Sequence, residues 1–144
     1  MRVVRYVNIE DLKRLSAQWD RLARGVPFRT WAWASTWWRH YGSDAPSRGA
    51  DPELFVLVVF DDAGRPVGIA PWYCCTSLAH GRIVRFLGSG EVCSDYLSLL
   101  CLPGSESLVA TAVAEWLADG RRKRQDRWDL IELAGVDASD ATVG

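Results

Sequence analysis

Apolar residues recur at spacings of three or four in the first third of the chain, which predicts two helices. A short strand at residues 2–7 comes first. Asn8 is then placed to cap a helix that Gly25 ends, and Thr30 to cap a second helix that Gly42 ends. The apolar positions are Ile9, Leu12, Leu15, Trp19 and Leu22 in the first helix, and Trp31, Trp33, Ala34, Trp37, Trp38 and Tyr41 in the second.

The apolar side of the second helix is unusually wide. Its side chains sweep an arc of about 160°, which is more than one core-facing stripe normally needs. We therefore expect an exposed apolar patch near Trp33, Trp37 and residues 94–96, and such a patch usually marks an interaction site.

The middle of the chain alternates between apolar runs and turn residues, which predicts strands. Residues 54–60, LFVLVVF, are continuously apolar, as in a strand covered on both faces. A short turn containing Gly64 joins this run to residues 66–73, so we expect the two runs to be antiparallel neighbours. Further along we expect strands at residues 82–87 and 95–101, a helix at 105–119 and a last strand from Trp128.

This order of elements predicts an α/β (α+β) fold, in which helices flank a mixed, mostly antiparallel sheet. The chain has 144 residues, of which 49% are hydrophobic and 24% are charged. That composition is typical of one globular domain with a substantial core.

Charge and cysteine content exclude several classes of function. The net charge of -1 gives no overall attraction to nucleic acid, and the basic run at residues 121–124 is interpreted as a solvated loop. We expect no membrane span and no signal peptide, and hence a cytoplasmic protein. The chain has four cysteines without C-x-x-C spacing and two histidines, so we expect buried reduced thiols, with no metal site and no disulfide framework.

One short motif suggests a phosphate-binding loop. Residues 85–90, RFLGSG, match R-x-x-G-x-G, the pattern with which acyl-CoA-dependent N-acyltransferases hold a pyrophosphate. Such a loop needs a helix directly after it, because the amides of the first helical turn bind the anion. The next residues alternate like a strand, so we interpret Gly88–Gly90 as a turn and predict that no helix begins there.

The junction at residues 101–106, CLPGSE, is where a strand is expected to lead directly into a helix. Cys101 stands where the phosphate-loop pattern has Arg or Gln, and Glu106 replaces its second small residue. A carboxylate at Glu106 would repel a pyrophosphate. We therefore expect this chain to bind no cofactor itself.

Taken together, the motifs resemble the N-terminal half of a CelD-like, or cellulose-biosynthesis-type, tandem acyltransferase of the GNAT superfamily, which is related to the Fem-type peptidyltransferases. They span nearly the whole chain. The residues that carry the resemblance are Trp19-x-x-Leu22, Pro27-Phe28-x-Thr30-x-x-Trp33-x-x-x-Trp37, Gly68-Ile69-Ala70-Pro71, Phe86-Leu87-Gly88, Ser94-Asp95-Tyr96-Leu97 and Trp128-Asp129-x-Ile131-x-Leu133.

The resemblance implies a GNAT-like domain at residues 1–136, with 137–144 as a tail or the start of a missing second half. It also implies that acyl-CoA is a co-substrate of the complete enzyme and is held by that second half, while this half lines the cleft for an amine-bearing small molecule or glycan acceptor. The expected partner is the second half or another copy of the chain. The alternative is a non-catalytic binding or assembly module that docks through an aromatic face.

Six residues are candidates for the acceptor site. Asp95 is the candidate for holding an amine or accepting its proton, although it could simply turn the chain before a strand. Ser94 and Tyr96 flank it and are candidates for binding the acceptor. Trp33, Trp37 and Trp72 are candidates for an aromatic wall, with core packing as the alternative. Trp72 alternates with Tyr73 on an expected strand, so one of the two sides is expected to face the cleft.

Overall fold

The computed structural model describes residues 1–42, 52–90, 94–120 and 124–143. The basic run at residues 121–124 lies mostly outside these residues, and Cys93 lies wholly outside them. The elements in chain order are β1 (Arg2–Tyr6), α1 (Ile9–Leu12), the 3-10 turn η1 (Lys13–Leu15), α2 (Ser16–Ala23), the 3-10 turn η2 (Pro27–Arg29), α3 (Trp31–Tyr41), β2 (Glu53–Leu54), β3 (Val56–Phe60), β4 (Pro66–Ala70), β5 (Trp72–Ser77), β6 (Gly81–Phe86), β7 (Leu100–Cys101), α4 (Glu106–Gly120), the 3-10 turn η3 (Arg124–Asp126) and β8 (Leu130–Ile131).

The strands of the described residues form two four-stranded sheets. Their orders are β1-β3-β4-β7 and β2-β5-β6-β8. Every pairing is antiparallel except that of β6 with β8, which is parallel. This confirms the predicted mixed, mostly antiparallel α+β fold, with the difference that the strands divide between two sheets.

One long hairpin supplies strands to both sheets. Its first arm contains β2 and β3, which are separated by Phe55, and its second arm contains β4 and β5, which are separated by Pro71. The two arms pair along their whole length, from Leu54 opposite Tyr73 to Phe60 opposite Pro66. The antiparallel neighbours expected from the sequence are therefore confirmed.

Pro71 is the point at which the second arm changes its neighbour. Before it, Ile69 pairs with Leu100 of β7. At Pro71 the carbonyl accepts a hydrogen bond of 2.8 Å from Leu87 N, and from Trp72 onward the arm pairs with β6. Proline has no N–H to donate to a ladder, so a change of partner at this residue leaves no donor unpaired. Pro71 is therefore the residue at which the two sheets part.

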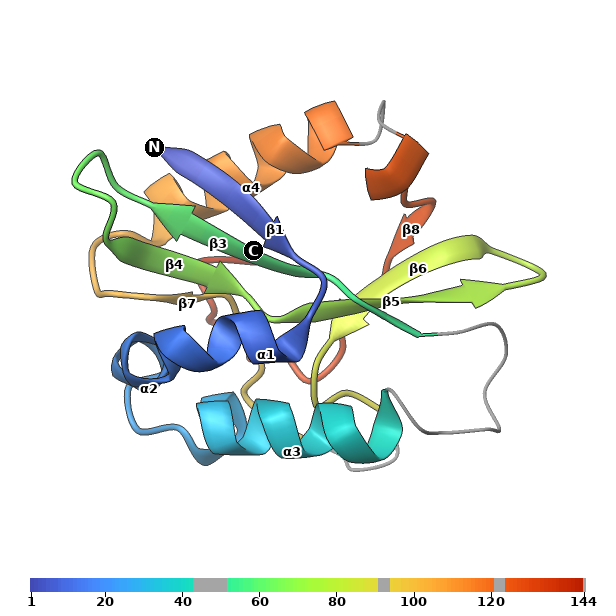
Figure 1. The fold of residues 1–144 in the computed structure, drawn as a ribbon, viewed down its shortest axis with the longest axis horizontal. Helices are drawn as coiled ribbons and strands as arrows, with labels where there is room; N and C mark the ends of the chain where they lie inside the picture. Colours follow the sequence, from blue (N-terminus) through green and yellow to red (C-terminus); the bar gives the residue numbers. More distant parts are fainter. Residues whose placement is uncertain (43–51, 91–93, 121–123, 144) are drawn as a thin grey trace.

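Helices cover both faces of the first sheet, with α4 on one side and α1, α2 and α3 on the other (Figure 1). All five residues of β3 are buried and alternate between the two sides. Leu57 and Val59 pack in the cluster under α4, whereas Val56, Val58 and Phe60 pack in the cluster against the other helices. The expectation of a strand covered on both faces is confirmed, and alternation across a pleated strand is its cause.

The helical expectations hold with one difference. Asn8 caps α1 by accepting from Glu10 N, and Thr30 caps α3 by accepting from Trp33 N, as expected. The first helix, however, is divided by the 3-10 turn η1. It ends at Ala23, where Arg24 has a left-handed backbone with a φ of 54°. In the described part of the chain, no helix is long and apolar enough to cross a membrane.

The expected strand at residues 95–101 is mostly wrong, because only Leu100–Cys101 pairs as β7. The side chains do alternate, since Leu97, Leu99 and Cys101 pack on the α4 side and Leu100 packs on the other. The ladder partner is missing, because the hairpin arm has turned to β6 at Pro71. The last strand is likewise reduced to Leu130–Ile131.

A group of ion pairs ties the two sheets together. Arg5 of β1 donates from Nη1 to Asp126 Oδ1 at 2.7 Å and from Nη2 to Glu53. Arg82 of β6 binds the other carboxylate oxygen of Glu53 at 3.1 Å. Arg5 and Asp126 are both more than nine-tenths buried, and the Arg5 guanidinium lies 4.5 Å from the centre of the Phe55 ring. These contacts join β1, β2, β6 and η3.

Candidate functional site

The loop that follows β6 meets α3, which is distant in the sequence, at Gly88. Gly88 has a φ of +94°, a conformation that favours glycine. A Cβ atom at Gly88 would lie 3.1 Å from Trp33 Nε1 on α3 and 3.2 Å from Ser94 Oγ. The structure therefore brings together two of the predicted site residues, Trp33 and Ser94, at the place where the sheets part.

Both of these side chains carry a buried polar atom. Among the residues that the structure describes, Trp33 Nε1 and Ser94 Oγ have no hydrogen-bond partner; both atoms are inaccessible to solvent, and Ser94 is only 4% exposed. Leaving such a group unpaired costs about 1–3 kcal/mol. Buried orphan groups of this kind need a physical explanation, and a bound polar group that completes them is one.

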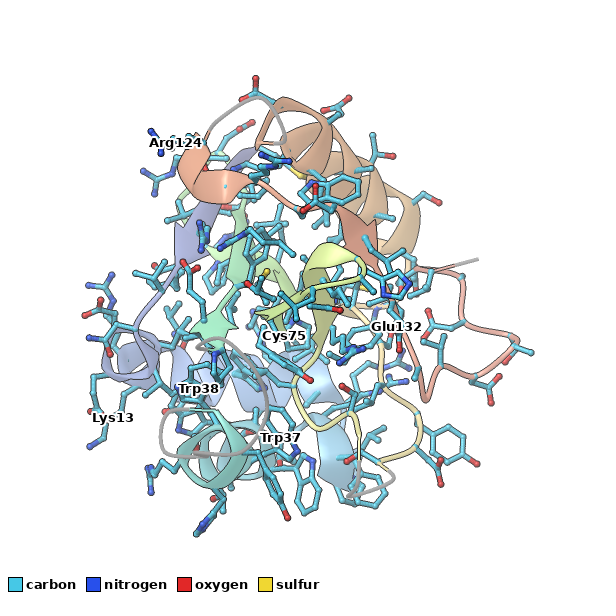
Figure 2. The ribbon with its side chains drawn as sticks, turned by 90° about the vertical axis from the view of Figure 1, so that its right-hand side faces the viewer. Lys13, Trp37, Trp38, Cys75, Arg124 and Glu132 are labelled. Atoms are coloured by element: carbon cyan, nitrogen blue, oxygen red, sulfur yellow. The ribbon has the colours of Figure 1, made fainter. Side chains whose placement is uncertain are left out.

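A recess of about 350 Å³ lies beside this junction, lined by Tyr73, Arg85, Ser89, Gly90, Glu132 and Ala134. Its residues come from β5, from β6 and the loop after it, and from the segment after β8. Figure 2 looks onto this region, with Cys75 and Glu132 near the centre of the view and Trp37 below them. Because β6 and β8 are parallel, their carboxyl ends reach the recess together.

An ion pair forms the polar wall of the recess. Arg85 Nη2 lies 3.2 Å from Glu132 Oε2, and the two side chains are 33% and 52% exposed. Burial lowers the pKa of Arg85, but its hydrogen bond to the Glu132 carboxylate and the neighbouring groups that can carry negative charge outweigh burial and hold the pKa above its usual value. Arg85 also donates from Nη1 to Cys75 Sγ at 3.6 Å, while its Nε has no partner. The recess thus presents a fixed positive charge beside a carboxylate.

An aromatic group supports the other wall. The Trp37 ring packs against Tyr73 at a centroid distance of 5.1 Å and against Tyr41 at 5.6 Å. Trp37 is only 6% exposed, so it holds Tyr73 in place and does not itself face the recess. Its contribution to the exposed patch expected from the sequence is correspondingly small.

The wide aromatic arc of α3 is covered because the helix has several neighbours. Trp31 packs edge-on against Trp19 of α2 at 5.4 Å, and Trp33 packs against Phe28 at 5.1 Å. Trp37 and Trp38 are buried, whereas Trp31 and Trp33 are partly exposed. One core-facing stripe alone would have left part of this arc exposed, but Trp19, Phe28 and Tyr73 pack against it as well as the sheet.

Trp72 lies on the side of β5 opposite to the recess. It is 3% exposed and packs against Phe86 in the cluster under α4, with ring centres 6.3 Å apart. Successive side chains of a strand point to opposite faces, so Tyr73 faces the recess and Trp72 does not. The structure therefore separates Trp72 from Trp33, Trp37 and Ser94.

Asp95 and Tyr96 are exposed and lie outside the lining of the recess. Within the described ranges, no residue forms a hydrogen bond or ion pair with the Asp95 carboxylate. Tyr96 has a left-handed backbone, with a φ of 59°, and its carbonyl accepts a hydrogen bond from Arg29 Nε. This contact fixes the backbone at Tyr96. The exposed side chains of Asp95 and Tyr96 point away from the core and can meet a ligand or partner.

The loop at residues 85–90 opens no helix where it is described. Ser89, Gly90, Ser94 and Asp95 are non-helical, and residues 91–93 lie outside the described ranges. Ser89 instead donates from its backbone and its hydroxyl to the Phe86 carbonyl, which closes a turn. The predicted turn is confirmed for these residues.

The junction between β7 and α4 carries carboxylates. Glu106 is in the first turn of α4 and lines a cavity of about 230 Å³ together with Arg24, Arg29 and Asp140. Burial raises the pKa of Asp140, but hydrogen bonds from Ser98 and Thr142 outweigh burial and lower it, so Asp140 stays ionised. Burial lowers the pKa of Arg29, whose guanidinium lies 3.8 Å from Asp140. The start of α4 therefore lacks the uniformly positive surroundings of a pyrophosphate site.

From the sequence, Glu132 was not identified, the choice between the Trp72 and Tyr73 sides of the strand was left open, and Arg85 was considered only as part of a phosphate loop. The signal for Tyr73 was its alternation with the apolar Trp72. The signal for Glu132 was its place between Ile131 and Leu133, as the polar residue of an otherwise apolar run. Only the fold shows that these two positions reach the same recess.

Metal binding has no support among the residues that the structure describes, because no three His, Cys, Asp or Glu side chains are grouped suitably.

Comparisons with protein-family models, curated proteins and solved structures find no match to this chain. Function is therefore inferred from the residues and their geometry.

Proposed function

We propose that this chain is a GNAT-like N-terminal domain of an N-acyltransferase and that it forms the cleft for the amine acceptor. The acyl-CoA co-substrate is held by a second GNAT-like half. The observation that carries the proposal is the recess lined by Tyr73, Arg85 and Glu132, whose wall also includes Ser89 and Gly90, next in the chain to Gly88.

The recess offers the groups that amine acylation requires. An amine that binds as an ammonium ion needs a carboxylate to hold it and to accept its proton, and Glu132 is within the recess. The freed nitrogen lone pair attacks the thioester carbonyl. The C–N bond then forms, the C–S bond breaks, and the coenzyme A thiolate leaves and is protonated.

We propose that the acyl donor binds outside this chain, because neither candidate phosphate loop has all the groups that pyrophosphate binding requires. The loop at residues 85–90 closes a turn onto Phe86, and α4 begins with Glu106. Pyrophosphate binding at a helix N-terminus relies on free backbone amides and on the positive end of the helix dipole. The Glu106 carboxylate in the first turn of α4 would repel the anion.

Nuclear magnetic resonance of the full chain tests this proposal. Tryptophan indole N–H signals report on the site directly, so glucosamine is expected to shift the Trp33 indole and Gly90 amide signals and to leave the Trp72 indole unchanged. N-Acetylglucosamine, which lacks the ammonium ion, is the matched control. Glu132→Gln should abolish the glucosamine response, whereas Asp95→Asn should preserve it if Glu132 is the group that holds the amine.

Three outcomes would contradict parts of the proposal. If no amine perturbs these signals, the acceptor site is wrong. Equal responses to glucosamine and N-acetylglucosamine would favour the alternative of a glycan-binding module, which the partial exposure of Trp31 and Trp33 would serve. If acetyl-CoA shifts the amides of Ser89, Gly90 or the first turn of α4, the donor site belongs to this chain after all.

A further inference from the structure

The recess holds two opposite charges side by side, and both can be reached from solvent. Arg85 and Glu132 are 3.2 Å apart and substantially exposed. A pair with this exposure contributes little to stability, typically about 0–1 kcal/mol. A ligand with only an ammonium group would meet the repulsion of Arg85, and a ligand with only a carboxylate would meet that of Glu132.

Arg85 retains much of its capacity to donate hydrogen bonds. A guanidinium has five N–H groups, and it binds carboxylates best through two parallel hydrogen bonds. Among the described residues, Nη2 donates to Glu132, Nη1 donates only to the Cys75 sulfur, a weak acceptor, and the buried Nε has no partner. A carboxylate could therefore bind the two Nη atoms of Arg85 without displacing any strong acceptor other than Glu132.

Glu132 can bind a positive group of a ligand in the same way as Arg85 can bind a negative one. Its carboxylate is about half exposed, and Arg85 is its ion-pair partner. A ligand that brings an ammonium group as well as a carboxylate replaces one ion pair by two. Its own charges cancel, as those of Arg85 and Glu132 do, so no net charge is left in the recess.

We infer that the acceptor is a zwitterion with its ammonium and carboxylate groups on neighbouring carbon atoms, that is, an α-amino acid. Arg85 binds the carboxylate and Glu132 binds the ammonium group. The inference rests on the proposed acceptor function of this recess and names the class of molecule that it takes. The volume of about 350 Å³ is near the lower limit of about 300–1,000 Å³ that is usual for small-molecule sites, which suits an amino acid.

This assignment has a consequence for turnover. Acylation converts the ammonium group into an amide, which has no positive charge. The product keeps the contact with Arg85 but loses the contact with Glu132 and faces its negative charge. An N-acyl amino acid should therefore bind more weakly than the free amino acid, which favours release of the product.

Three related ligands separate the two charges. L-Alanine carries both, L-alaninamide carries only the ammonium group, and N-acetyl-L-alanine carries only the carboxylate. Titration of the full chain, followed by the Trp33 indole and Gly90 amide signals, should show L-alanine binding about tenfold or more tightly than either of the others.

Variants assign each charge to its residue. Arg85→Gln should weaken L-alanine about tenfold without weakening L-alaninamide, and Arg85→Lys should recover part of the loss because it keeps the charge but not the two-bond geometry. Glu132→Gln should weaken L-alanine to a similar extent without weakening N-acetyl-L-alanine. The matched control is Arg65→Gln, which removes an arginine that pairs with Asp61 in the turn between β3 and β4. It should leave all three affinities unchanged.

The results distinguish failure of this inference from failure of the proposed function. If L-alaninamide or glucosamine binds at these signals as tightly as L-alanine, the acceptor site stands and the zwitterion is wrong. If N-acetyl-L-alanine binds as tightly as L-alanine, the role of Glu132 is wrong. If none of these amines perturbs the recess, both the acceptor site and the inference are overturned.

Discussion

Val109 of α4 lies against the backbone of Gly68 in β4, so that a Cβ atom at Gly68 would be 2.4 Å from Val109 Cγ1. The helix and the sheet approach this closely only because residue 68 has no side chain. We therefore expect Gly68→Ala to destabilise the protein by about 1–3 kcal/mol through overpacking. Urea denaturation measures the change.

A double variant distinguishes the steric cause from a backbone effect. Val109→Ala removes the clashing methyl groups, so the cost of Gly68→Ala should be smaller in that background than in the wild type. Equal costs in the two backgrounds would show that contact with Val109 is not the reason for glycine at this position.

Gly88 is expected to be required for two reasons that can be separated. Gly88→Ala places a side chain in a left-handed conformation and against Trp33 and Ser94. Gly64→Ala is the matched control, because Gly64 also has a positive φ, of +76°, but nothing lies within 4 Å of its Cβ position. We expect backbone strain of about 1–3 kcal/mol in both variants and an additional loss only at Gly88. The difference in free energy of unfolding measures the crowding at the site.

The buried pair of Arg5 and Asp126 is expected to be important for stability. Asp126→Ala removes one carboxylate from the buried Arg5 guanidinium, which still binds Glu53, so the expected cost is about 3 kcal/mol, at the lower end of the range for breaking buried pairs. Asp62→Ala is the control, because the Asp62 carboxylate that meets the N-terminal amine is exposed. It should leave the thermal midpoint unchanged, and similar losses in the two variants would contradict this view.

Cys74 is expected to make stability depend on alkaline pH. Burial raises the pKa of its thiol from 9.0 to about 11. Between these values the unfolded thiol loses its proton while the folded thiol keeps it, so the free energy of unfolding should fall as pH rises from 9.0 towards about 11. Cys74→Ala should show a shallower fall over this window. The buried Cys101, whose pKa burial also raises, acts in the same direction in both proteins.

Local patterns predicted the helices and the central hairpin because the forces that form them are local. The caps at Asn8 and Thr30 depend on residues within one helical turn, and the pairing of residues 54–60 with 66–73 depends on a short turn. The strand expected at residues 95–101 failed for a nonlocal reason. Its alternation was real, but its ladder partner turns away at Pro71, and no pattern within residues 95–101 contains that fact.

The candidate site, like the fold, was predicted only in part from the sequence. Trp33 and Ser94 were selected from the sequence and lie together at Gly88, although they are far apart in the chain. The choice between Trp72 and Tyr73 depends on which face of β5 meets the recess, and this is set by the packing of α3 and α4 on opposite sides of the sheets. The approach of Glu132 to Arg85 depends on the parallel pairing of β8 with β6, which residues 128–134 alone do not specify.

The passage of one hairpin through both sheets has a consequence for how the chain folds. The turn at residues 61–65 closes a short loop between β3 and β4, so this hairpin has little loop-closure entropy to overcome. Once its arms have paired past Phe55 and Pro71, each sheet already has one pair of adjacent strands, β3 and β4 in the first sheet and β2 and β5 in the second. The sheets should then appear in a single kinetic phase, and no species with one sheet formed and the other absent should accumulate.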